Sequence, residues 1–382
     1  MYLLVILATL FILLYCIFYK KPKTIEKFFP AWQDHTIYSR LSRRVNVGIW
    51  RGWLNINNLL LSDKLLEYTN MNLIIYETNN EVIDALLITK KVDIGIVTEA
   101  DYGIYLTTKL ENENNGVFTK EDMIKNKKTI LHNFNTRRLF TFYKLYRFLI
   151  VNNLRINKPS DLDGNTIEIT NLTNEINKLD LDLLKDIKYT KVYRDVGRGV
   201  SQFDSVNKLG MQIDGYFTQY DYPNPVLSEI SSRVNCTLID LYSDGNKDGG
   251  KKDSGRKDNG NKIVSPDKIL KKYFYLNKDK MSLDAYPELV SRRKDVIDFY
   301  GLPYKSNSVN CYSFKMIMLS RSDVQDEWIY LFTKSIIDNL HSIKKDIPYL
   351  HEVNKAAMYK STLSDILPIH PAVFEQGKYL NK

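Results

Sequence analysis

Short apolar runs typical of strands alternate with helix-like stretches along this chain. In the first half, residues 45–50, 73–76 and 93–97 have the pattern of strands, and residues 55–68 and 81–90 have the pattern of helices. Strands joined through helices form parallel sheets, because a parallel connection needs a crossover of about a dozen residues or more. The first half therefore predicts a parallel α/β unit.

The same alternation returns in the middle of the chain. Residues 146–151 and 166–170 have the pattern of strands, with a short helix and turn at 158–164 between them. Residues 206–215 end a helix and start a strand, as residues 84–95 do in the first unit. The chain has 382 residues and is 44% hydrophobic, which exceeds what one compact core usually holds. We expect two α/β lobes around a cleft.

One internal segment does not fit either lobe. Residues 244–262 read DGNKDGGKKDSGRKDNGNK and contain no apolar side chain. Such a segment cannot offset the entropy cost of ordering by burying apolar surface. It is predicted to be a disordered surface insertion.

The N-terminus has the length and composition of a membrane anchor. Residues 1–19 are almost wholly apolar, and at about 1.5 Å per residue they just cross a hydrocarbon core of about 30 Å. Neither the basic start nor the small-residue cleavage site of a secretory signal is present, so we expect the segment to be retained, followed by a polar leader at 20–35. Lys20, Lys21 and Lys23 follow the anchor, and the positive-inside rule places the large domain in the cytosol.

The net charge of the chain favours an anionic partner but does not identify its kind. Lys and Arg number 54 against 45 Asp and Glu, a formal net charge of +9. Acidic and basic residues are interleaved, and no helix-turn-helix, RRM or zinc-finger pattern is present. We expect no nucleic-acid binding, which leaves a lipid headgroup or a carboxylate ligand.

The residues of common catalytic and metal sites lack the required spacing. The five histidines and three cysteines form no zinc motif, and no nucleophile elbow, P-loop or dinucleotide fingerprint occurs. Glu99 and Asp101 are an isolated acidic pair of the kind usually found in solvated loops. We therefore predict no enzyme activity, no catalytic residues, no metal and no cofactor. Cys236 and Cys311 either form one bridge in an extracytoplasmic domain or remain two buried free thiols.

Several stretches resemble, in the same order, blocks of the TAXI family of TRAP-transporter receptors. They are residues 82–105 (VIDALLITKKVDIGIVTEADYGIY), 136–143 (TRRLFTFY), 161–164 (DLDG), 213–217 (IDGYF), 222–225 (YPNP), 324–339 and 367–372 (LPIHPA). Together they span roughly residues 45–375. The chain is therefore similar to a family of solute-binding proteins over most of its length.

The resemblance implies a two-lobed type II periplasmic-binding-protein-like fold behind an N-terminal transmembrane helix. Lobe I would comprise residues 36–143 and 310–382, and lobe II residues 144–309. The implied ligand is a small carboxylate such as glutamate or a dicarboxylate, which separate membrane permease subunits would receive. The resemblance places the soluble domain outside the cytoplasm, on the side opposite to that given by the positive-inside rule.

Most of the predicted ligand-binding residues follow the carboxyl ends of strands, where α/β folds hold ligands, whereas Tyr143 is expected at the lobe crossover and Tyr216 on the cleft wall. The predicted residues are Trp50, Arg51, Trp53, Thr78, Asn79, Asn80, Thr98, Glu99, Tyr143, Asn171, Thr173 and Tyr216. Arg51 either clamps a carboxylate or lies on the surface beside core tryptophans, and Thr78 and Asn80 either contact ligand or cap the next helix.

The chain departs from the family at the turn 170–174 (TNLTN), where the family has glycines that allow a close backbone approach to ligand. This departure motivates an alternative: an ectodomain of the same fold that serves protein contacts or surface attachment without binding a solute.

Overall fold

The computed structural model describes residues 44–50, 63–64, 66–67, 73–78, 89–114, 119–126, 135–152, 156, 159–170, 176–185, 187–194, 213–242, 266–300, 307–347, 350–351 and 353–373. The predicted anchor, the polar leader, the insertion at 244–262 and most of the two helices expected at 55–68 and 81–90 lie outside these residues. Among the helices in the described ranges, none has the length and apolar character needed to cross a bilayer.

The strands form one mixed sheet. In spatial order they are β2 (Leu73–Thr78), β1 (Val45–Trp50), β3 (Ile94–Thr98), β10 (Ser308–Arg321), β4 (Thr136–Val151), β7 (Gly215–Tyr220), β5 (Thr166–Thr170) and β6 (Thr190–Arg194). Two further strands, β8 (Thr237–Ile239) and β9 (Asn277–Ser282), pair with β4 and β10 respectively. The protein thus has the mixed α/β fold that the alternating sequence predicts.

Two sets of strands within the sheet have the same arrangement. In the first set β1 pairs in parallel with β2 and β3, and β3 pairs antiparallel with β10. In the second set β5 pairs in parallel with β6 and β7, and β7 pairs antiparallel with β4. The repeated alternation in the sequence therefore corresponds to two parallel sets, each ending on a long antiparallel strand.

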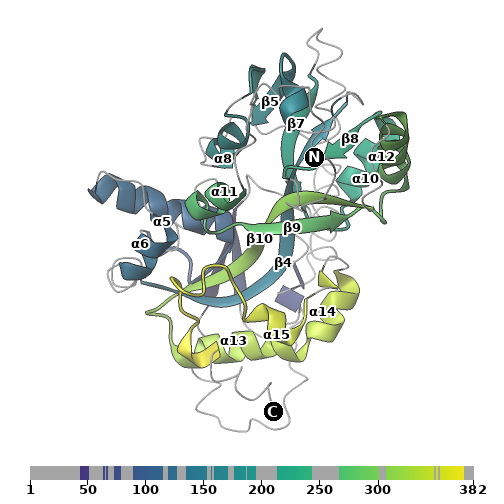
Figure 1. Cartoon of the computed structure of the whole chain (residues 1–382). Coiled ribbons are helices and arrows are strands. Elements are labelled where there is room, and N and C mark those ends of the chain that lie inside the picture. The colour runs from purple at the N-terminus through teal and green to yellow at the C-terminus, as the bar shows by residue number, and fades with distance from the viewer. Residues whose placement is uncertain are drawn as a thin grey trace, which may run out of the picture.

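The long strands β4 and β10 cross the middle of the molecule and pair with each other (Figure 1). The expectation of a strand only at residues 146–151 was too short, because β4 begins at Thr136. Its first part carries Arg137, Arg138 and Lys144, charges that argue against a buried strand in the sequence alone. In the fold Arg138 is nevertheless buried, and its Nη2 donates to the main-chain carbonyl of Tyr359, which lies in a distant segment.

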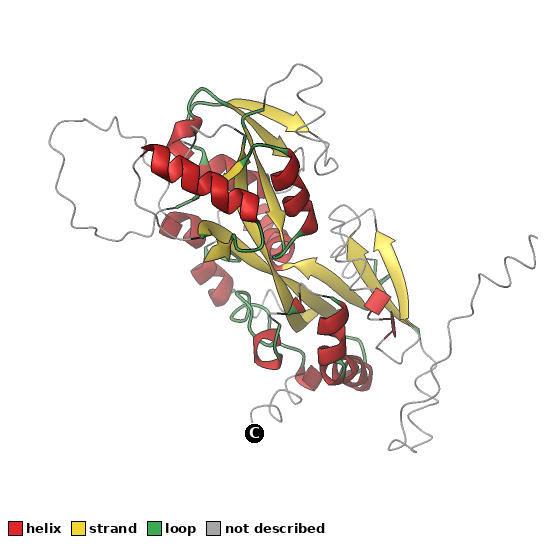
Figure 2. Ribbon diagram, turned by 90° about the vertical axis from the view of Figure 1, so that its right-hand side faces the viewer, coloured by secondary structure: helices red, strands yellow, loops and turns green. Residues whose placement is uncertain are grey.

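Helices surround the sheet on both sides (Figure 2). The helical elements are α5 (Glu99–Asn114), α6 (Lys120–Lys125), η2 (Pro159–Leu162), α8 (Ile176–Leu183), α10 (Pro225–Arg233), α11 (Pro266–Lys272), α12 (Pro287–Tyr300), α13 (Asp326–Asp338), α14 (Leu340–Asp346) and α15 (Lys355–Met358). In Figure 1, α13, α14 and α15 lie below the crossing strands and α8, α10 and α12 lie above them. Helix α5 was not expected from the sequence, because its apolar residues are interspersed with polar ones.

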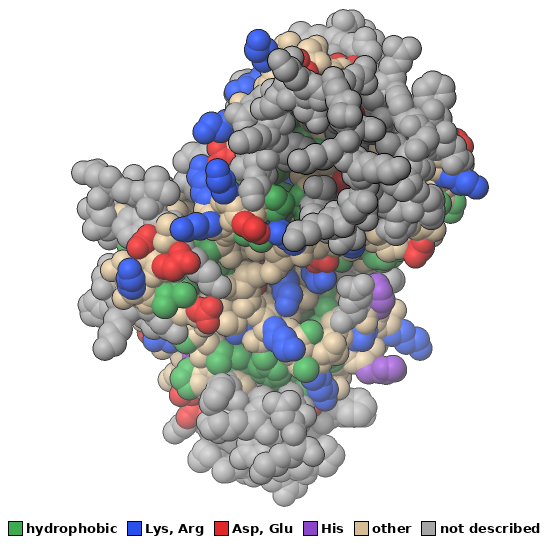
Figure 3. Space-filling model, in the orientation of Figure 1, with side chains coloured by type: hydrophobic (Ala, Val, Ile, Leu, Met, Phe, Trp, Pro, Cys, Tyr) green, Lys and Arg blue, Asp and Glu red, His purple; other side chains and the backbone are tan. Residues whose placement is uncertain are grey.

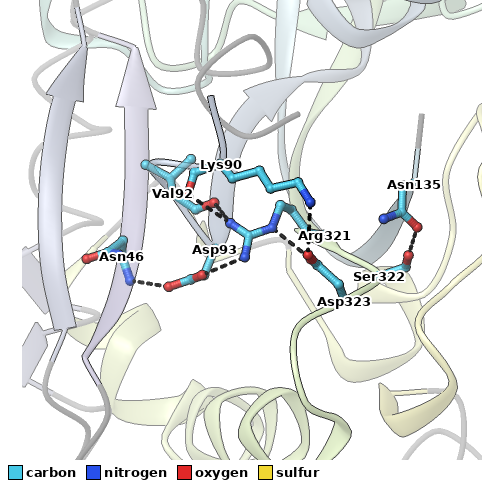
Figure 4. Close-up of polar contacts among 8 residues, drawn as sticks. All are labelled: Asn46, Lys90, Val92, Asp93, Asn135, Arg321, Ser322 and Asp323. Atoms are coloured by element: carbon cyan, nitrogen blue, oxygen red, sulfur yellow. Dashed lines mark hydrogen bonds and ion pairs between the residues drawn. The ribbon is translucent and has the colours of Figure 1, made fainter. Parts of the chain in front are cut away.

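Arg321, at the end of β10, links strands of the first parallel set through an ion pair and hydrogen bonds (Figure 4). The Arg321 guanidinium lies 3.1 Å from Asp93 Oδ1 and donates to Asp323 Oδ1 at 2.7 Å and to the carbonyl of Val92 at 2.6 Å. The other oxygen of Asp93 accepts from the backbone N–H of Asn46 at 2.9 Å. One buried ion pair therefore joins β10, the start of β3 and β1.

Both cysteines in the described ranges are buried and free. Of the two alternatives left open by the sequence, two free thiols is the one the fold adopts. Burial raises the pKa of the Cys236 thiol to about 11 and also raises that of Cys311. Neither thiol is therefore ionised near neutral pH.

Gly103 allows helix α5 to pack closely against the segment before β9. A Cβ atom at position 103 would lie 2.4 Å from Cδ1 of Tyr275, closer than real carbon atoms approach. We expect Gly103→Ala to lower the free energy of unfolding by about 1–2 kcal/mol, because overpacking outweighs the better helix propensity of Ala. Urea unfolding measures this change.

The matched control adds Tyr275→Leu, which removes the ring that a Cβ at position 103 would meet. In the Tyr275→Leu background, Gly103→Ala should lower the free energy of unfolding by less than it does in the wild type. A Gly103→Ala protein more stable than the wild type would contradict the close packing.

Candidate functional site

The parallel strands of both sets have their carboxyl ends beside the middle parts of β4 and β10. Thr98, the last residue of β3, lies opposite Met316 of β10, and Tyr220, the last residue of β7, lies opposite Tyr146 of β4. We call residues 143–147 of β4 and 312–316 of β10 the strand crossover. In α/β folds, ligands bind beyond the carboxyl ends of parallel strands. The crossover is thus the position at which both sets would contribute to one site.

A row of polar side chains runs across three strands at the crossover. Tyr312 of β10, Arg147 of β4 and Gln219 of β7 are consecutive cross-strand partners. Cross-strand partners share one face of a sheet. All three side chains are buried. We call these three residues the polar row.

The charge in the polar row is neutralised within the protein. Arg147 Nε donates to Oδ1 of Asp180 at 3.1 Å, and Arg147 Nη2 also donates to Oδ2 of Asp180. The guanidinium lies 5.6 Å from the centre of the Phe217 ring. The pair holds Arg147 in one orientation and joins β4 to helix α8.

The other two members of the row retain unused hydrogen-bonding groups. The amide Oε1 and Nε2 of Gln219 and the hydroxyl of Tyr312 are buried and have no hydrogen-bond partner among the described residues. Buried polar atoms in proteins are nearly always bonded to protein, water or ligand. The row therefore has a donor and acceptors that no described residue occupies.

Two predicted ligand residues precede the helix that carries Asp180. Asn171 and Thr173 come between β5 and α8 in the sequence and lie outside the described residues. Helix α8 begins at Ile176, and its Asp180 contacts Arg147 of the polar row. The position of the two side chains remains a prediction.

Two further predicted residues end neighbouring strands. Trp50 is the last residue of β1 and pairs with Thr78, the last residue of β2. Both residues end their strands at the same edge of the sheet as Thr98, and the structure does not describe their side chains. The other predicted residues that lie wholly outside the described ranges are Arg51, Trp53, Asn79 and Asn80.

Thr98 caps helix α5. Its hydroxyl accepts from the backbone N–H of Asp101 at 2.9 Å and donates to Asp101 Oδ2 at 2.7 Å, and the Thr98 N–H reaches the same carboxylate at 3.4 Å. This reciprocal pair is a capping box, which the Thr-x-x-Asp spacing in the sequence already encodes. Asp101, considered above as half of an acidic pair, is held by this cap.

Glu99 is fully buried and accepts hydrogen bonds from two distant segments. Its Oε1 accepts from the hydroxyl of Ser361 at 2.6 Å and the N–H of Thr362 at 3.0 Å, and its Oε2 accepts from the N–H of Lys315 at 2.9 Å. Burial raises the pKa of Glu99 above its usual value, although these hydrogen bonds act in the opposite direction. The carboxylate joins α5, β10 and the C-terminal segment.

The two predicted tyrosines lie in different surroundings. Tyr143 is buried at the crossover, within the larger apolar core. Tyr216 is buried in β7 among side chains of the smaller core, which include Phe148 and Leu227. Because side chains alternate along a strand, Tyr216 faces the side of the sheet opposite to Gln219.

The sequence contained a signal for the polar row that the motif analysis missed. Arg147 interrupts an apolar run, and Gln219 lies in a strand of otherwise aromatic and small residues, yet both are buried. A charged or amide side chain inside a buried strand is uncommon and needs a partner. Such residues were candidates even without a known motif.

No family model and no curated protein sequence matches the chain. The solved structures that match include the open substrate-binding domain 2 of GlnP from Lactococcus lactis, with 10% identity over 81% of this chain and 97% of that chain and a TM-score of 0.36. A structure from work on glutathione import via GshT in Streptococcus mutans has 11% identity over 83% and 99% of the two chains and a TM-score of 0.42. The aliphatic sulphonate binding protein SsuA from Escherichia coli has 10% identity over 88% and 78% and a TM-score of 0.36.

These likenesses are too low to assign a ligand or a partner to this chain. The resemblance to TAXI receptors stays a prediction. What the polar row and the converging strand ends do must therefore follow from their own geometry.

Proposed function

We propose that this protein is a solute-binding receptor that holds a small polar ligand at the strand crossover and does not transform it. The observation that carries the proposal is the polar row, with unused buried hydrogen-bonding groups where the carboxyl ends of both parallel sets meet. The two lobes would be residues 36–143 with 310–382 and residues 144–309, hinged at β4 and β10. Closure of the lobes would exclude water and strengthen each hydrogen bond to the ligand.

The chemistry of the row favours binding over catalysis. Arg147 and Asp180 neutralise each other, and an amide such as Gln219 does not exchange protons. Burial raises the pKa of Tyr312, so its hydroxyl stays protonated near neutral pH. These groups orient a polar ligand without supplying an acid, a base or a nucleophile.

A small carboxylate, glutamate or a dicarboxylate, is the ligand class that we propose. Asp180 neutralises the one charge of the polar row, Arg147, so the carboxylate would be bound by groups outside the row, of which Arg51 is our candidate. Residues 1–19 would hold the receptor at the membrane, with its soluble domain outside the cytoplasm. The receptor would deliver its ligand to separate TRAP-type permease subunits.

Thermal unfolding and calorimetry with a panel of amino acids and dicarboxylic acids test this function. We expect at least one compound to raise the melting temperature in a saturable manner. Gln219→Leu should then weaken that compound about tenfold or more, because the loss of a buried hydrogen bond to ligand costs about 1–3 kcal/mol. Thr218→Val is the matched control, since Thr218 neighbours Gln219 on β7 and faces the other side of the sheet.

The same panel decides between binding and the alternative, an ectodomain for protein contacts or surface attachment. The absence of glycine from residues 170–174 favours that alternative, because side chains there hinder a backbone approach to ligand. No response to any compound would support it and contradict solute binding.

A further inference from the structure

Two irregularities in β4 bring three polar residues onto one face of the sheet. The register between β4 and β10 shifts twice over residues 315–319, with an extra residue in β4 each time. As a result Arg138, Thr141 and Lys144, although three residues apart, all share a face with Lys315 and its neighbours. We call this the reverse face, because Lys315 lies three positions from Tyr312 and so points away from the polar row.

A C-terminal segment, residues 357–364, crosses the reverse face. Thr141 Oγ1 lies 2.8–3.1 Å from the carbonyl oxygens of residues 357, 358 and 360. Arg138 Nη2 donates to the carbonyl of Tyr359 at 3.0 Å, and Lys315 Nζ donates to the carbonyl of Lys360 at 3.0 Å. Two cations thus bind carbonyls of consecutive residues, which places them near each other.

Arg138 is a buried cation with open donors. Its side chain is part of a residue only 3% exposed, and its Nε and Nη1 have no hydrogen-bond partner within the described ranges. The carboxylate that interacts with it electrostatically is Glu99, whose two oxygens are already occupied by Ser361, Thr362 and the Lys315 N–H. A buried guanidinium in this state lacks the acceptors that its desolvation requires.

Among the residues that the structure describes, positive charge exceeds negative charge on the reverse face. Lys144 is paired with Asp279 at 2.9 Å, which leaves Arg138, Lys315 and Lys360 opposite Glu99. Burial lowers the pKa of Lys315, and the positive charges of Lys144, Arg138 and Lys360 lower it further, although Glu99 acts to raise it. Figure 3 shows Lys and Arg side chains across the middle of the molecule, with Asp and Glu side chains among them.

We propose that a small inorganic anion of the size of chloride binds to Nε of Arg138 beneath residues 357–364. The anion would supply an acceptor to the Nε–H group and the missing negative charge. A monatomic ion accepts hydrogen bonds from any direction and needs little space, which suits a guanidinium this deeply buried. By neutralising Arg138 it would hold the C-terminal segment against β4 and β10.

Thermal unfolding of the full chain in sodium chloride and in sodium gluconate at equal ionic strength tests the site. Gluconate is too large for a buried position, so it serves as the reference salt. We expect chloride to raise the melting temperature saturably by roughly 2–4 °C, as binding to the folded state alone requires. Arg138→Met should abolish this difference and Lys315→Met should reduce it, whereas Lys345→Met, on the exposed end of α14, should leave it unchanged.

Bromide provides a readout that does not depend on the folding of Arg138→Met. Crystals grown in sodium bromide should show an anomalous scattering peak within hydrogen-bond distance of Arg138 Nε. Equal melting temperatures in chloride and gluconate, or a water without anomalous signal at this position, would overturn the proposal. If Arg138→Met does not fold, Lys315→Met and the bromide peak decide.

Discussion

Asp180→Ala is expected to lower the free energy of unfolding by about 3–5 kcal/mol, among the largest single effects in this protein. The replacement leaves Arg147 as an uncompensated charge in the interior, since both residues of the pair are almost fully buried. It also removes the contact between β4 and helix α8. Urea unfolding followed by circular dichroism measures the loss.

Asp182 on the same helix is the matched control. Its carboxylate pairs with Lys272 at 2.5 Å and accepts from the Tyr273 hydroxyl at 2.7 Å, but it is partly exposed. Asp182→Ala should cost only about 1 kcal/mol, because water solvates the partners that remain. Equal losses for the two variants would show that burial of the Arg147–Asp180 pair does not increase the cost of removing its carboxylate.

A double replacement separates the charge from the packing. Arg147→Met combined with Asp180→Leu removes both charges and keeps apolar volume at each position. We expect it to be markedly more stable than Asp180→Ala, because replacing a whole buried ion pair is often neutral or stabilising. The same variant should bind the proposed solute less well if Arg147 helps to orient the polar row.

Glu99→Ala is the second replacement with a large expected effect, about 3–5 kcal/mol of unfolding free energy. It leaves the Ser361 hydroxyl and the N–H groups of Thr362 and Lys315 without their acceptor. It also removes the negative charge that stabilises the buried Arg138 cation. Thermal unfolding measures the loss, and Glu327→Ala, on an exposed turn of α13, is the control.

The protonation of Glu99 adds a dependence on pH whose sign follows from its raised pKa. Burial makes the folded protein bind the proton of Glu99 more tightly than the unfolded chain does. The stability from this group is therefore fully present below the unfolded value of about 4.3 and is lost as pH rises through the folded value. Glu99→Gln should destabilise most at low pH, and its effect should shrink as the pH rises. An effect that grows with pH would indicate a lowered pKa instead.

The predicted ligand residues show that a sequence indicates where strands end more readily than it indicates which side chains contact one another. Glu99 was correctly expected after a strand, and Thr98, expected after it too, is the last residue of that strand, because an apolar run followed by polar residues marks a strand end. Their roles depend on partners that are distant in sequence. Glu99 accepts from Ser361 and Thr362, which lie more than 250 residues away, and no local pattern encodes that contact.

The sequence by itself determined the positions of β1, β2, β3 and β5, since hydrophobic periodicity and turn residues act over a few positions. Only the tertiary structure decided that β4 and β10 lie between the two sets, that Gln219, Arg147 and Tyr312 form one row, and that Arg138 is buried with open donors. These features depend on strand register and on two bulges, which turn side chains from one face of the sheet to the other. A shift of a single residue changes the face, and the sequence of one strand does not record its register with another.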